Sequence, residues 1–68
     1  MEELEFQTEM ITLKDLLKVT QLLPSGGIAK AVIKDEGVIV NGEDCFSPGK
    51  KLYKGDWLIF DDVKITIV

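Results

Sequence analysis

Residues 24–42 read PSGGIAKAVIKDEGVIVNG and carry the clearest structural signals in this chain. The first four residues break regular structure, and Ser25 is suited to cap a helix that we expect over about residues 27–36. Gly37 is expected to end this helix as a C′ residue in left-handed conformation. A β-branched segment follows, and Asn41-Gly42 is a strong signal for a tight hairpin turn. The stretch therefore predicts a helix followed by a hairpin.

A shorter helix is predicted before this stretch. Leu13, Leu16 and Leu17 fall on one helical face, which predicts a helix over about residues 13–20. Thr12 precedes it as N-cap, and Asp15 three residues later makes a variant of the capping box. On the later helix, the residues expected to face the core are Ala29, Val32 and Ile33.

Short strands are predicted on both sides of the two helices. Residues 1–11 alternate loosely between apolar and acidic side chains, which predicts an edge strand with its acids in water. Turn-forming residues at 47–49, 54–56 and 61–62 divide the rest of the chain, whose last two strands are expected over 57–60 and 63–68. The coarse order is β-α-α-β-β-β-β. This order predicts one α+β domain over residues 1–68, with two helices packed on a small, mostly antiparallel sheet.

The composition excludes several classes of protein. The chain has no His, so Ser-His and Cys-His nucleophile pairs and His-ligated zinc are absent. The single Cys45 cannot close an intrachain disulfide, and the acidic N-terminus is unlike a signal peptide. No apolar run is long enough to span a membrane. We therefore expect a cytoplasmic, monomeric binding module that is not an enzyme and holds no cofactor or metal.

The net charge of −4 argues at first sight against a nucleic-acid partner. The charge is unevenly distributed, however. Residues 12–34 carry four lysines and one acid, and residues 45–54 carry three lysines and no acid, so each block has a net charge of +3. Residues 1–11 and 35–44 carry four acids each and no lysine. The overall acidity therefore conceals two basic segments.

Five segments of this chain resemble the S4 RNA-binding domain, and most closely its stand-alone bacterial form, the YaaA/YbcJ-like proteins. The resemblance covers about residues 10–60. The segments that carry it are Ile11-Thr12-Leu13-Lys14-Asp15-Leu16-Leu17, Ser25-Gly26-Gly27-Ile28-Ala29-Lys30, Val38-Ile39-Val40-Asn41-Gly42-Glu43, Gly49-Lys50-Lys51-Leu52 and Lys54-Gly55-Asp56.

The resemblance implies a small S4-like (alpha-L) fold that binds structured RNA without catalysing a reaction. The expected partner is ribosomal RNA or transfer RNA, either free or as part of a ribosomal subunit. The protein itself is expected to act in ribosome biogenesis. A helix that begins with two glycines exposes N–H groups suited to a phosphate, and lysines along a helix flank add charge. The residues expected to bind RNA are Lys14, Lys18, Ser25, Gly26, Gly27, Lys30, Lys34, Asn41, Gly42, Lys50 and Lys51.

Each of these residues also has a purely structural interpretation. The helix lysines suit solvated helix faces, and Ser25-Gly26-Gly27 suits a turn with a cap. The primary role expected for Asn41-Gly42 is a type I′ turn, and Lys50 and Lys51 suit protection of a strand edge. Trp57 is expected in the core, and Tyr53 is the better candidate for stacking on a base.

Two other functions stay open at this point. The acidic strand at residues 1–11 suits a protein-interaction module that meets a basic partner, such as a ribosomal protein. A β-grasp carrier shares the short length, the acidity and a strand ending in Asn-Gly-Glu. Such carriers need a terminal Gly-Gly, however, and this chain ends Ile65-Thr66-Ile67-Val68.

Overall fold

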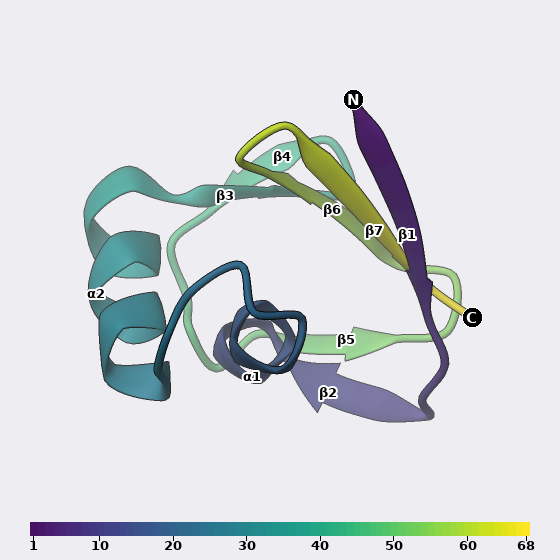
Figure 1. Ribbon diagram of the computed structural model, residues 1–68, viewed down its shortest axis with the longest axis horizontal. Coiled ribbons are helices and arrows are strands. Elements are labelled where there is room, and N and C mark those ends of the chain that lie inside the picture. Colours follow the sequence, from purple (N-terminus) through teal and green to yellow (C-terminus); the bar gives the residue numbers. More distant parts are fainter.

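The computed structural model describes all residues 1–68 and contains two helices, α1 (Leu13–Val19) and α2 (Gly26–Glu36). In Figure 1, α1 is seen end-on and α2 from the side, so the two helices cross steeply. Leu13, Leu16 and Leu17 of α1 are fully buried, as their spacing predicts. On α2, Ala29 and Ile33 are buried, whereas Val32 is only half-buried.

Seven strands form two sheets. A five-stranded sheet has the order β1-β7-β6-β3-β4, and a two-stranded ribbon pairs β2 with β5. All pairs are antiparallel except β1 with β7. The strands are β1 (Glu2–Phe6), β2 (Met10–Thr12), β3 (Val38–Val40), β4 (Glu43–Cys45), β5 (Lys51–Tyr53), β6 (Trp57–Phe60) and β7 (Val63–Ile67).

The core lies between the helices and one face of the large sheet. Cross-strand pairing places Ile65, Leu58 and Val40 side by side on this face, and all three are buried. The ribbon adds Leu52, which is also buried. All twelve buried residues belong to one apolar cluster, and none of them is polar or charged. The predicted arrangement of two helices on a mostly antiparallel sheet is therefore confirmed.

The single N-terminal strand predicted over residues 1–11 is wrong, because this segment forms two strands in different sheets. β1 pairs in parallel with the C-terminal β7, and β2 pairs antiparallel with β5. The observed order is β-β-α-α-β-β-β-β-β, with the chain changing sheets at residues 7–9. The alternation of side chains indicates a strand, but it does not reveal which distant strand becomes its partner.

Two details of the helix ends also differ from the predictions. The Thr12 side chain makes no cap hydrogen bond, and its buried hydroxyl has no partner. The N–H groups of Leu13 and Lys14 donate instead to the carbonyls of Lys50 (2.9 Å) and Pro48 (3.1 Å). At the end of α2, Gly37 has a positive φ of 78°, but its ψ of 165° is extended rather than left-handed helical.

The face of the large sheet opposite the core carries half-buried and exposed residues in a row across the strands. Glu3, Lys64, Ile59, Ile39 and Asp44 are successive cross-strand neighbours from β1 to β4. Trp57 lies on the same face and is half-buried, not in the core, with the Lys64 Nζ 4.9 Å from its ring centroid. Neither helix has the length and apolar composition needed to cross a membrane.

Candidate nucleic-acid interface

The N-terminus of α2 is open to solvent and to a ligand. The Ser25 hydroxyl accepts a hydrogen bond from the Ile28 N–H at 3.2 Å, so Ser25 caps the helix as predicted. The two glycines that follow it have no packing role: a Cβ added at Gly26 would meet nothing within 4 Å, and one at Gly27 would meet only the Ser25 Oγ, at 4.0 Å. The first turn contains no acidic residue. The positive end of this helix is therefore neither covered nor neutralised.

The N-terminus of α1 is closed by the chain itself. Carbonyls of the turn at residues 47–50 take the N–H groups of Leu13 and Lys14, and Asp15 lies in the first helical turn. This contact joins the two basic segments of the sequence. It brings the backbone of Lys50 against Leu13 at the start of α1, while strand pairing places Lys51 opposite Thr12.

The remaining lysines of the predicted site lie on the two helices. Lys18 is in the last turn of α1, and Lys30 and Lys34 follow each other one turn apart on α2. All three are exposed, whereas Lys14 is half-buried. The two helices pack against each other, and the turn at residues 47–50 meets the start of α1. We call Lys14, Lys18, Lys30, Lys34, Lys50 and Lys51 the lysine surface.

Asn41-Gly42 has a structural role that ties it to a different part of the molecule. Both residues have positive φ, of 52° and 86°, as a type I′ turn requires. The Asn41 amide donates from Nδ2 to the Asp56 Oδ1 at 3.1 Å, and its Oδ1 accepts from the Trp57 N–H at 3.0 Å. These bonds attach the β3–β4 turn to the β5–β6 turn. The side chain of Asn41 is therefore already engaged.

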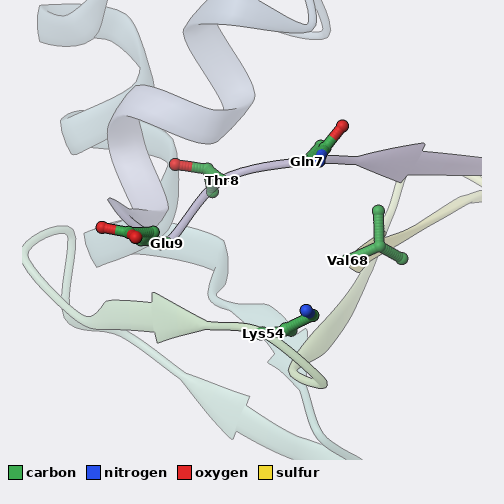
Figure 2. A pocket seen from close by; sticks show the side chains of 5 residues that line it. All are labelled: Gln7, Thr8, Glu9, Lys54 and Val68. Atoms are coloured by element: carbon green, nitrogen blue, oxygen red, sulfur yellow. The ribbon is translucent and has the colours of Figure 1, made fainter.

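A shallow cavity of about 470 Å³ lies apart from the predicted site. Figure 2 shows its lining: the β1–β2 connection with Gln7, Thr8 and Glu9 lies on one side, and Lys54 and Val68 lie on the other. This cavity was not predictable from the sequence, because it forms only where the N-terminal segment leaves one sheet for the other. One lysine and one glutamate do not make a strongly charged site, and no cluster of side chains here or elsewhere is arranged to hold a metal ion.

The fold and the family comparison agree on the class of protein. The sequence model of the S4 domain family matches residues 4–68, so this chain belongs to the S4 domain family, an RNA-binding α/β fold. One relative is the "Probable ribosome maturation protein RlbA" of Bacillus subtilis (strain 168). It is 43% identical over 53 residues, which cover 78% of this chain and 75% of the relative.

Family membership confirms the resemblance found in the sequence and extends it toward both ends of the chain. The matched region includes β7 and the last three residues of β1, the parallel pair that the sequence did not reveal. It also removes the β-grasp carrier from consideration, since a different family accounts for nearly the whole chain.

Proposed function

We propose that this protein binds structured RNA, ribosomal RNA in particular, through the lysine surface and the open N-terminus of α2. It acts in ribosome maturation and catalyses no reaction. The observation that carries the proposal is the junction at the start of α1. There the two basic segments, far apart in sequence, meet through hydrogen bonds of 2.9 and 3.1 Å between the helix and the turn at residues 47–50.

The chemistry of the surface supports recognition of RNA by its shape. The chain has eight lysines and no arginine. Lysine binds phosphate as a point charge, whereas bidentate reading of a guanine edge is the typical role of arginine. Folded RNA is recognised largely through phosphates and 2′-hydroxyls. Gly26 and Gly27 add unobstructed N–H groups at a helix N-terminus, where a phosphate oxygen is favoured.

The relative from Bacillus subtilis supports ribosomal RNA over transfer RNA. That relative is named a probable ribosome maturation protein, and 43% identity over most of both chains makes a shared role the simplest proposal. Transfer RNA remains the alternative ligand that the binding experiment must include.

The decisive experiment measures binding to ribosomal RNA and to transfer RNA over a series of salt concentrations. A variant with Lys30, Lys34, Lys50 and Lys51 all changed to Gln is expected to bind ribosomal RNA more weakly at every salt concentration. The plot of log affinity against log salt concentration has a negative slope, and each phosphate contact that is lost makes this slope shallower by about one unit. Co-sedimentation of the tagged protein with ribosomal subunits and their precursors then identifies the particle.

Lys64→Gln is the control for the loss of a single lysine charge, because it removes one charge from the opposite face of the large sheet. It is expected to leave both the affinity and the salt slope unchanged. The proposal fails if ribosomal RNA is not bound at low salt, or if the fourfold variant behaves like Lys64→Gln. Co-sedimentation that survives removal of RNA would point instead to a basic protein partner of the acidic strand.

A further inference from the structure

The outer face of the β2–β5 ribbon is the least explained surface of the molecule. Ile11 and Leu52 point inward: Leu52 is buried, and Ile11 packs against the core. Since side chains alternate along a strand, Met10 and Thr12 of β2 share the opposite face with Lys51 and Tyr53 of β5. The pairing places Met10 directly opposite Tyr53 and Thr12 directly opposite Lys51.

Tyr53 and Met10 form an exposed apolar pair on this face. Their exposed fractions are 51% for Tyr53 and 44% for Met10. In a chain of 68 residues with a single small core, an aromatic ring left this exposed does not contribute to packing as a core residue does. No hydrogen bond or core contact in the fold accounts for its position at the surface.

Three lysines lie close to Tyr53 in the chain, and the Asp56 carboxylate accepts a hydrogen bond from its backbone N–H. Lys51 is two residues earlier on the same face of β5, so its Cα lies about 7 Å away along the strand. Lys50 comes directly before Lys51, and its carbonyl contacts the start of α1. Lys54 directly follows Tyr53 in the chain. All three lysines are exposed. An aromatic ring among lysines is the combination that proteins use to bind unpaired nucleotides, in which bases stack and phosphates pair with the charges.

We propose that Tyr53, backed by Met10, is a stacking platform for an unpaired base of the bound RNA, with Lys51 contacting the adjacent phosphate. This inference rests on the proposed function and extends the interface from the helices to the outer face of the ribbon. It assigns this face an unpaired nucleotide from a loop, bulge or end. The bases of a continuous duplex are already stacked and offer no free face to Tyr53.

The backbone holds Tyr53 in place before any ligand arrives. Its N–H donates to the Asp56 Oδ2 at 2.8 Å, and its carbonyl accepts from the Asp56 N–H at 2.9 Å. Asp56 is in turn bonded to the Asn41 amide. A ring carried by a fixed strand end loses little conformational freedom on binding, which favours affinity.

The test compares Tyr53→Phe and Tyr53→Leu with the unchanged protein. The probes are an RNA hairpin carrying a run of unpaired adenosines and the same stem without that run. Tyr53→Phe keeps the ring and is expected to retain binding. Tyr53→Leu is expected to lose about ten-fold or more of its affinity for the hairpin with unpaired adenosines, with little change for the stem alone and no change in salt slope.

Three outcomes distinguish this inference from the proposed function. Loss of affinity in Tyr53→Leu with retention in Tyr53→Phe supports the platform. Equal binding by both variants overturns the platform while leaving the lysine surface in place. Absence of binding by the unchanged protein to either probe or to ribosomal RNA overturns both. Circular dichroism on each variant verifies the fold. Met10→Thr is a second change on the same exposed face, and the platform predicts that it weakens binding to the hairpin with unpaired adenosines.

Discussion

The two ends of α2 both carry glycine, but for different reasons. At the C-terminal end, Gly37 has a φ of 78° and a ψ of 165°, a region that is essentially restricted to glycine. A Cβ there would lie 2.8 Å from Cε2 of Phe46. At the N-terminal end, Gly26 and Gly27 are the first residues of the helix and have open space around them. The fold requires the glycine at one end and does not require the pair at the other.

This difference separates a glycine that the fold requires from a pair of glycines that the proposed function uses. Glycine in a helix costs roughly 0.5–1 kcal/mol relative to alanine, and at Gly26 and Gly27 no packing or backbone requirement offsets that cost. Under the proposed function, the pair lets a phosphate approach the N–H groups at the helix start without a side chain in the way. Substitutions at the two ends should therefore affect different measurements: the free energy of unfolding at Gly37, and the affinity for RNA at Gly26 and Gly27.

Gly37→Ala is expected to have the largest effect on stability. The backbone conformation alone costs about 1–3 kcal/mol for a residue with a side chain, and the contact with the Phe46 ring adds to it. We expect a loss of about 2–3 kcal/mol in the free energy of unfolding, measured by urea denaturation, with unchanged RNA affinity of the folded fraction.

Gly37→Asn is the informative companion to this variant. Asparagine tolerates the left-handed helical region but not an extended ψ at positive φ. We therefore expect it to destabilise the protein about as much as alanine does. A near-neutral Gly37→Asn would mean that the residue is left-handed helical after all, as its position after the helix first indicates.

Gly27→Glu should have the largest effect on RNA binding at the opposite end. A carboxylate in the first turn interacts favourably with the helix dipole, so stability is expected to stay the same or to rise by about 0.3–1 kcal/mol. The same charge would repel a phosphate and occupy its place, and we expect the affinity for ribosomal RNA to fall by about ten-fold. Gln7→Glu adds the same charge in the exposed β1–β2 connection and should leave binding nearly unchanged. An equal loss of RNA affinity in Gly27→Glu and Gln7→Glu would show that only the net charge of the protein matters.

The ends of α2 also show how far the sequence predicts the fold. The cap at Ser25, the helix length to within one residue and the type I′ turn at Asn41-Gly42 all follow from local chemistry, and the structure has each of them. Local chemistry also predicts that Gly37 is the residue that ends α2. It does not specify the ψ of Gly37, and it does not reveal that the ring of Phe46, directly after β4, lies 2.8 Å from the place of a Cβ at residue 37.

The features that the sequence did not reveal all depend on distant partners. Thr12 has the right residue type for a cap, but the first N–H groups of the helix donate to the carbonyls of residues 48 and 50 instead. The sequence of β1 predicts an edge strand, but it does not indicate that this strand pairs in parallel with β7. The list of lysines was available from the sequence, whereas their meeting at the start of α1 required the turn at residues 47–50 to fold back. The composition of the candidate site was therefore predictable, and its geometry was not.

Ser25→Ala tests the capping difference between the two helices. The Ser25 hydroxyl accepts a hydrogen bond from Ile28, so its removal is expected to cost about 1 kcal/mol of stability. Thr12→Val is the matched change at the start of α1. Because the Thr12 hydroxyl is buried without a partner, this substitution is expected to be neutral or slightly stabilising. Thermal unfolding of both variants provides the measurement, and a costly Thr12→Val would show that this hydroxyl has a partner after all.

Gly26→Ala has a small expected effect on stability, and its sign is opposite to that of Gly37→Ala. Alanine fits the helical backbone and the open space at this position, so the free energy of unfolding should rise by about 0.5–1 kcal/mol. If the glycines serve to let a phosphate approach the helix start, the methyl group should at the same time weaken RNA binding by a few-fold without altering the salt slope, because no charge changes. A protein that becomes more stable and binds RNA as well as before would show that a phosphate does not approach the helix closely at this residue. A variant that gains stability while losing affinity would show that Gly26 is kept for binding at the expense of the helix.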